Sequence, residues 1–265
     1  MAVMSEKPDY SYQRSEHFCS QSNGADHPGM GSRKNGVNQG GGTTAERPRL
    51  FFGILPGEYT RICAAARVKE FTRGEMLYVE GDSVQQVTLL TSGFVKITLL
   101  GLSGTEVILS LGVPGDVLGV VDQFFFAGRH CTTAQASRLC RALVWDAPTF
   151  KTLVERFPVL HQNMVRILGE YLLELEERFR ELATERVGPR VARQVVRLLE
   201  KIGRPVNGEV EIGLSREELA QMTGTTLFTV SRLLSAWGAR GMVRPRREAV
   251  TICDVQSLRA MSEEI

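Results

Sequence analysis

The chain has 265 residues, of which 43% are hydrophobic and 23% charged, and its formal net charge is only +2. This length and composition accommodate two globular domains. No apolar run reaches the roughly 18 residues of a membrane span, and the polar N-terminus does not resemble a secretory signal. The five cysteines are scattered and lack the spacing of a zinc or haem motif. We therefore expect no bound metal and a reducing cytoplasm as the setting.

Residues 1–48 are predicted to form a disordered polar tail, because they are rich in Ser, Asn and Gly and poor in apolar side chains. Such a segment cannot bury enough apolar surface to offset the entropy lost on ordering. Cys19 lies within this tail. It is interpreted as a plain free thiol, with a redox role as the alternative.

The next part, residues 49–157, is predicted to form a sensor domain built mainly of short strands. A helix is expected from Pro56 to about Arg67, since Pro suits the first helical position and apolar residues recur at three- and four-residue steps. Short β-branched runs punctuated by glycines follow, which is typical of a small β-barrel or sandwich. The predicted strands are Met76–Val79, Val87–Leu90, Phe94–Leu99, Val107–Leu111, Thr132–Ala136 and Leu143–Trp145.

A long helix is predicted over residues 158–184, where apolar residues recur at alternating three- and four-residue steps over close to three heptads. This seam favours a parallel two-helix dimer, because the remaining positions are largely charged. Packing of the same residues on the chain's own sensor domain is the alternative. The seam consists of Val165, Leu168, Leu172, Leu175, Phe179 and Leu182.

Residues 185–262 are predicted to form a winged helix-turn-helix DNA-binding domain. Ser215 and Glu218 predict a capping box that starts one short helix, and Gly224 permits the turn after it. Thr225 or Thr226 then caps a second helix. Its inner face is predicted to contain Val230, Leu233, Leu234 and Trp237. Its outer face is expected to read DNA through Thr226, Leu227, Phe228, Thr229, Ser231 and Arg232. An ordinary helical hairpin is the alternative.

Two short β-like runs, Met242–Val243 and Ala249–Ile252, predict a hairpin with a basic tip. Arg244, Arg246 and Arg247 lie between them and are expected to reach the DNA backbone as a wing. Residues 186–265 contain 13 Lys or Arg against 9 Asp or Glu, which concentrates a net charge of +4 in this domain. That concentration indicates phosphate binding, although a basic loop alone is more often a solvated surface.

The order of these parts resembles the CRP/FNR family of bacterial transcription regulators over residues 49 to about 260. The matching motifs are Arg73–Leu77, Glu80–Asp82, Ser92–Gly93, Pro114–Gly119, Val187–Ala192, Leu214–Ala220 and Thr229–Leu234. The resemblance implies an α+β chain with a cyclic-nucleotide-binding-like β-barrel, a long dimerisation helix and a C-terminal winged helix-turn-helix. It also implies a homodimer on a near-palindromic site in double-stranded DNA, with RNA polymerase as a partner.

The resemblance fails where family members that bind cyclic nucleotides hold their ligand. Those members follow a glycine with Glu-Leu, which holds the ribose, and place Arg-Ser or Arg-Thr ten residues after the glutamate to hold the phosphate. Here Val120–Val121 follows Gly119, and His130–Cys131 takes the Arg-Ser place. Leu175–Glu176 stands near the place of two hydroxyls that contact adenine. We therefore expect a degenerate effector pocket without cAMP, in which Arg129 is the only possible substitute cation.

Other effectors and functions receive less support. Iron–sulfur members of the family need several N-terminal cysteines, and Cys19 stands alone; haem on His130 or Cys131, or a redox thiol, remains a minor alternative. Phe228 replaces a glutamate that often accepts a hydrogen bond from cytosine, and it packs either on a thymine methyl or inside the turn. Arg232 is expected to bind guanine. The competing hypothesis is a module that regulates a protein partner without binding DNA. No nucleophile–base pair or phosphate loop indicates an enzyme.

Overall fold

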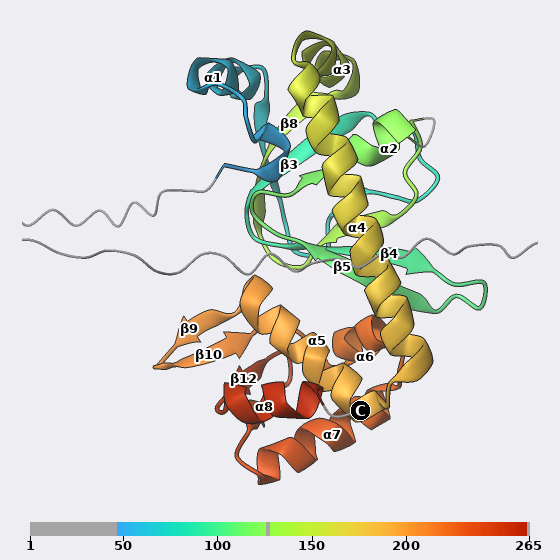
Figure 1. Ribbon diagram of the computed structural model, residues 1–265, viewed down its shortest axis with the longest axis vertical. Helices are drawn as coiled ribbons and strands as arrows, with labels where there is room; N and C mark the ends of the chain where they lie inside the picture. Colours follow the sequence, from blue (N-terminus) through green and yellow to red (C-terminus); the bar gives the residue numbers. More distant parts are fainter. Residues whose placement is uncertain (1–46, 126–127, 264–265) are drawn as a thin grey trace, which may run out of the picture. The chain divides into compact units, whose positions relative to one another are not determined.

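The computed structural model describes residues 47–125 and 128–263 (Figure 1). The predicted polar tail, including Cys19, lies outside the described residues except for its last two positions. The described chain begins with a 3-10 turn, η1 (Arg49–Phe51), and helix α1 (Pro56–Ala64). Helix α1 starts at Pro56 as predicted but ends before Arg67, because Arg67 already pairs with Val144 in a sheet.

Two four-stranded antiparallel sheets form the body of the sensor domain. In spatial order the first sheet contains β1 (Arg67–Phe71), β8 (Cys140–Asp146), β3 (Gln86–Ser92) and β6 (Val117–Leu118). In spatial order the second contains β2 (Met76–Tyr78), β7 (Thr133–Ala136), β4 (Val95–Leu100) and β5 (Glu106–Gly112). Each predicted strand overlaps one of these, whereas β1 and β6 were not predicted.

The two sheets face each other in a jelly-roll-like arrangement rather than a closed barrel, so of the predicted barrel or sandwich the two-sheet form is the one observed. Ile97 of β4 and Val144 of β8 belong to one core between the sheets. The other side of the first sheet packs on helices through Val87 and Trp145. Alternating apolar residues and glycine turns are common to barrels and sandwiches, so the sequence pattern could not separate the two.

Helix α2 (Val120–Phe125) lies between β6 and β7, and helices α3 (Ala147–Arg156) and α4 (Pro158–Thr184) follow the last strand of the sensor domain, β8. Helix α4 is unbroken over the 27 residues predicted. Leu160 and Met164 anchor its first turns in the core beside Trp145. Although α4 is long, neither it nor any other helix in the described ranges is apolar enough over a sufficient length to cross a membrane.

The C-terminal part is a winged helix-turn-helix (Figure 1). Its helices are α5 (Val187–Ile202), α6 (Arg216–Thr223), α7 (Leu227–Ala239) and α8 (Val255–Ser262). Its sheet has the order β11 (Val243–Pro245), β12 (Val250–Ile252), β10 (Glu209–Ile212) and β9 (Arg204–Val206). Of the predicted inner face of α7, Val230, Leu234 and Trp237 are fully buried and Leu233 packs against the same core. The β9–β10 hairpin was not predicted.

Candidate functional site: DNA-reading surface and sensor pocket

Local hydrogen bonds fix the two helices of the helix-turn-helix. The Ser215 hydroxyl accepts a bond of 3.1 Å from the Glu218 backbone N–H, and the Glu218 carboxylate accepts one of 2.8 Å from the Ser215 N–H. Gly224 then adopts left-handed φ and ψ values of 59° and 40°, which favour glycine. Thr226 caps α7 by accepting a bond of 3.1 Å from the Thr229 N–H. The predicted capping box and turn are confirmed, and Thr226 rather than Thr225 is the cap.

The outer face of α7 is open to solvent. Phe228 is 76% exposed, which excludes the alternative that it packs inside the turn. Arg232 is also exposed, and it forms no ion pair with any residue that the structure describes. Residues four positions apart lie on one face of a helix, so Phe228 and Arg232 project together. Thr229 and Ser231 flank them and are half-buried.

The predicted wing has the expected hairpin but a different charge arrangement. Arg244 lies within β11 rather than at the tip, and its guanidinium group forms bonds of 2.8 and 3.1 Å to the Glu209 carboxylate on β10. This contact raises the pKa of Arg244. Arg246 lies 3.9 Å from the Glu211 carboxylate. Arg247 is exposed and has no ion-pair partner among the described residues, so it is the wing arginine most available to phosphate.

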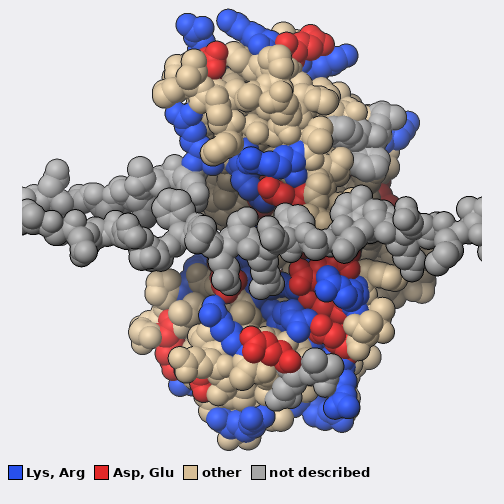
Figure 2. All heavy atoms as spheres, in the orientation of Figure 1, with Lys and Arg blue, Asp and Glu red and all other residues tan. Residues whose placement is uncertain are grey.

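On the face of the molecule shown in Figure 2, acidic and basic side chains are mixed rather than gathered in one basic patch. Figure 2 shows Lys and Arg interspersed with Asp and Glu, and basic side chains collect at the lower margin, where Figure 1 places α7. Within α7 (Leu227–Ala239) the basic residue is Arg232, and Arg240 follows directly after the helix as its C-cap; both are exposed. A helix that exposes one arginine, unpaired within the described chain, beside an aromatic ring fits base contact better than it fits charge-driven binding alone.

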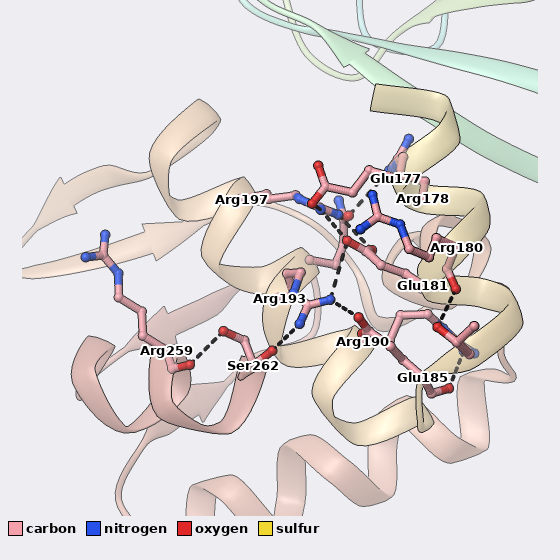
Figure 3. A network of polar contacts seen from close by, with 12 residues as sticks. Glu177, Arg178, Arg180, Glu181, Glu185, Arg190, Arg193, Arg197, Arg259 and Ser262 are labelled. Atoms are coloured by element: carbon pink, nitrogen blue, oxygen red, sulfur yellow. Dashed lines mark hydrogen bonds and ion pairs between the residues drawn. The ribbon is translucent and has the colours of Figure 1, made fainter. Parts of the chain in front are cut away.

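A polar joint connects α4 with the DNA-binding domain (Figure 3). Glu181 on α4 is only 5% exposed, and both terminal nitrogens of Arg197 on α5 donate to its carboxylate, one of them over 2.9 Å. Arg193 on α5 lies 3.5 Å from the same carboxylate and also bonds Glu185 and the Ser262 backbone oxygen. Helix α5 is therefore tied to α4 on one side and to α8 on the other.

Apolar side chains of α4 remain uncovered in the single chain. The exposed fractions are 49% for Val165, 55% for Leu172, 73% for Phe179 and 49% for Leu182. Two further seam positions, Leu168 and Leu175, are half-buried, and Leu168 contributes to a cavity of the sensor domain. Part of the predicted seam is thus turned toward the chain's own sensor domain, while the rest forms an exposed apolar stripe.

The sensor domain contains a partly open cavity of about 420 Å³ lined by β4, β5, the β6–α2 segment and α4. Of the predicted effector residues, Gly119 and Cys131 line it. Val120 is instead buried in the core. Arg129 is turned away and donates a bond of 2.8 Å to the Gly81 backbone oxygen. His130 is buried behind the wall rather than open to the cavity.

Asp122, which was not among the predicted pocket residues, organises this part of the wall. Its carboxylate lies 3.0 Å from Nδ1 of His130 and accepts a bond of 3.3 Å from the Cys131 backbone N–H. The ring of Tyr78 stacks on His130 with centroids 3.9 Å apart. Burial raises the pKa of Tyr78 and of Tyr171, which also line the cavity, so both phenols stay neutral. The Asp122 carboxylate thus already bonds the His130 ring and the Cys131 N–H, the groups at the position where a phosphate was considered.

The described residues contain no group of three or more His, Cys, Asp or Glu side chains placed to hold a metal ion. Cys131 is exposed, but partial desolvation of its sulfur and the nearby Asp122 raise its pKa, which disfavours the reactive thiolate. The groups of the sensor cavity that can contact a ligand are therefore its apolar side chains, its phenols and its carboxylates.

A ligand-sized cavity in one domain and an exposed reading helix in another define a one-component DNA-binding regulator. Two family models match: a cyclic nucleotide-binding domain over residues 68–157 and a Crp-like helix-turn-helix domain over residues 189–261. The chain belongs to the CRP/FNR family of transcription regulators, and its C-terminal part is the DNA-binding domain of that family.

Relatives and solved structures agree with this assignment. A CRP-like cAMP-activated global transcriptional regulator of Mycobacterium tuberculosis is 26% identical over 80% of this chain and 95% of the relative. A cyclic AMP receptor protein of Thermus thermophilus is 28% identical over 74% of this chain and 88% of the relative. A CooA mutant from Carboxydothermus hydrogenoformans matches with a TM-score of 0.61 and 26% identity, covering 77% of this chain and 90% of that one.

Proposed function

We propose that this chain is a homodimeric, sequence-specific DNA-binding regulator in the cytoplasm whose sensor pocket does not take cyclic nucleotides. The observation that carries the DNA-binding part is the outer face of α7. There Phe228 and Arg232 are exposed side by side on a helix that Thr226 caps and Gly224 orients. Arg232 can donate two bonds to a guanine edge, and Phe228 can pack on a thymine methyl.

The dimer rests on the exposed apolar stripe of α4. Val165, Leu172, Phe179 and Leu182 follow the heptad spacing of a two-helix seam and are about half-exposed or more in the single chain. Two chains joined along α4 would present two α7 helices related by a two-fold axis. Such a dimer fits two half-sites about 34–36 Å apart on one side of the duplex.

The proposal that the sensor pocket does not take cyclic nucleotides follows from the lack of an available positive charge for the phosphate among the predicted pocket residues. A cyclic phosphate needs a fixed cation, yet Arg129 bonds Gly81 and Asp122 occupies the N–H of Cys131. The names of two relatives include cyclic AMP, but their ligand is not carried over to this chain because Val120 and His130 are both buried away from the cavity. RNA polymerase is the proposed protein partner, by analogy with transcription regulators of the family.

The test compares two arginine variants of the same domain on one DNA site, chosen by selection from random sequences. Arg232→Ala should weaken binding by about 1–3 kcal/mol, which is the value of one bidentate base contact. Arg259→Ala is the control, because Arg259 is an exposed arginine of α8 that pairs with Glu200. Arg247→Ala should weaken all sequences alike, as expected of a phosphate contact.

Equal binding by Arg232→Ala and the parent protein would show that α7 does not read the site through Arg232. Absence of DNA binding by the parent protein, with the fold intact, would instead favour the competing module that regulates a protein partner.

A further inference from the structure

The cavity of the sensor domain has the size and wall of a small-molecule site. Its volume of about 420 Å³ lies within the range of about 300–1,000 Å³ that such sites occupy. Strands β4 and β5, the β6–α2 segment and α4 contribute mostly branched aliphatic side chains. These include Ile97, Leu99, Leu111, Leu118, Val121 and Ile167. A wall of this kind stabilises a ligand mainly by removing apolar surface from water.

The charged groups on the same cavity are predominantly negative. Four carboxylates line it, from Asp116, Asp122, Glu170 and Glu174. Arg49 and Lys201 are the lining cations among the described residues.

The Arg49 guanidinium group is already engaged at 3.0 Å by Asp116 and at 3.1 Å by Glu170. Lys201 lies on the exposed side of α5. No cation in the described chain is therefore both free and enclosed by this cavity.

The position that the sequence pattern assigns to a phosphate is closed by the protein's own anion. Asp122 accepts from the Cys131 N–H and lies 3.0 Å from His130, so these groups already have a carboxylate partner. A ligand anion placed there would meet Asp122 at close range without gaining a donor. Like charges in surroundings of reduced dielectric repel strongly, whereas a neutral donor group would be accepted.

We infer that the sensor pocket binds a largely apolar small molecule without negative charge, held by its aliphatic wall and by a hydrogen-bond donor directed at the Asp122, Glu174 and Tyr171 end. This inference rests on the proposed function, because it assigns the chemical class of the effector to that regulator's sensor. It predicts selection by charge as well as by size: an apolar amine or amide is accepted, and the corresponding anion is rejected.

Two fluorescent probes of one skeleton test this selection. N-phenylnaphthylamine is apolar, uncharged and carries one N–H donor, and anilinonaphthalene sulfonate adds a single negative charge to it. Titrated into the full chain, the uncharged probe should bind saturably with one site per chain. The sulfonate should bind at least about tenfold more weakly, because the charged groups that line the cavity are predominantly carboxylates.

Variants show whether the signal comes from this cavity or from the exposed stripe of α4. Ser110→Trp places a large ring into the cavity from β5 and should abolish saturable binding. Leu102→Trp adds the same ring at a fully exposed turn and should leave binding unchanged. Glu174→Gln and Asp122→Asn each remove one negative charge, so each should reduce the ratio between the affinities of the uncharged probe and the sulfonate. Glu174 is exposed on α4, so its variant keeps the test valid if Asp122→Asn misfolds.

Three results would overturn the inference: no saturable binding of the uncharged probe, binding that survives Ser110→Trp, or sulfonate binding as tight as that of the amine. The test is separate from that of the proposed function, because it needs no DNA. Arg232→Ala should bind the uncharged probe with unchanged affinity while its affinity for the selected DNA site falls. Normal probe binding by a parent protein that fails to bind DNA would refute the regulator and leave the pocket assignment standing.

Discussion

The ion pairs between α4 and α5 predict how much stability the protein loses when the charge of a buried carboxylate, that of Glu181, is removed. Glu181 is 5% exposed and its carboxylate is shared by Arg197 and Arg193. Glu181→Gln keeps the size of the side chain but removes its charge. It also turns an amide NH₂ toward guanidinium groups that cannot accept a hydrogen bond. We expect this substitution to loosen the connection seen in Figure 3.

The magnitude follows from the environment of the two arginines. Hydrogen bonds to charged groups contribute about 1.5–3 kcal/mol, and breaking a fully buried ion pair costs about 3–5 kcal/mol. The side chains of Arg193 and Arg197 are 27% and 29% exposed and retain Glu185 and Glu177 as partners. Water and these partners offset part of the loss, so we expect Glu181→Gln to lower the free energy of unfolding by about 2–3 kcal/mol.

Thermal unfolding followed by circular dichroism measures this loss, which corresponds to a fall in midpoint of roughly 4–12 °C for a unit of this size. The control is Glu200→Gln. Glu200 pairs with Arg259 over 2.9 Å, but the two side chains are 61% and 57% exposed. An exposed pair contributes about 0–1 kcal/mol, so the control should melt close to the parent protein. Equal midpoints for Glu181→Gln and Glu200→Gln would refute the reasoning.

Three further predictions concern assembly, the turn and the ligand. Leu172→Lys should convert a dimer into monomers in a sedimentation experiment, whereas Leu102→Lys, at the exposed turn between β4 and β5, should not; a parent protein that is monomeric at micromolar concentration would contradict the dimer. Gly224→Ala should destabilise the fold by about 1–2 kcal/mol, because φ is +59° there, whereas Gly57→Ala in open space at the start of α1 should not; the difference in denaturation midpoint measures this. Millimolar cAMP or cGMP should leave the melting temperature unchanged, whereas a ligand at about a hundred times its dissociation constant would add about 2.7 kcal/mol; a saturable upward shift would contradict the degenerate pocket.

The helix-turn-helix could be predicted from the sequence because local interactions determine it. Ser215 and Glu218 bond each other across a single turn, and Gly224 supplies a backbone conformation that few other residues adopt. The inner face of α7 follows directly from helical spacing. The long helix α4 was predictable for the same reason, since its period is carried by consecutive residues.

The sensor pocket could not be predicted in the same way, because its residues meet only in the folded chain. Tyr78, Asp122 and Tyr171 come from β2, α2 and α4 and share no sequence spacing. Sequence reasoning instead placed Val120 and His130 in the pocket by position along the chain, but both are buried and neither lines the cavity. The pairing of Arg244 with Glu209 was missed for a related reason, since the β9–β10 hairpin that carries Glu209 has a weak pattern.

Selection of bound sequences from random duplex DNA by the purified full-length protein tests the central claim most directly. The account predicts a near-palindrome whose half-sites are about 10 base pairs apart, bound by two chains per duplex. It also predicts that Arg232→Ala, applied to the same library, relaxes the preference at one position in each half-site. A library that shows no enriched sequence, or a single asymmetric site bound by one chain, would contradict the account.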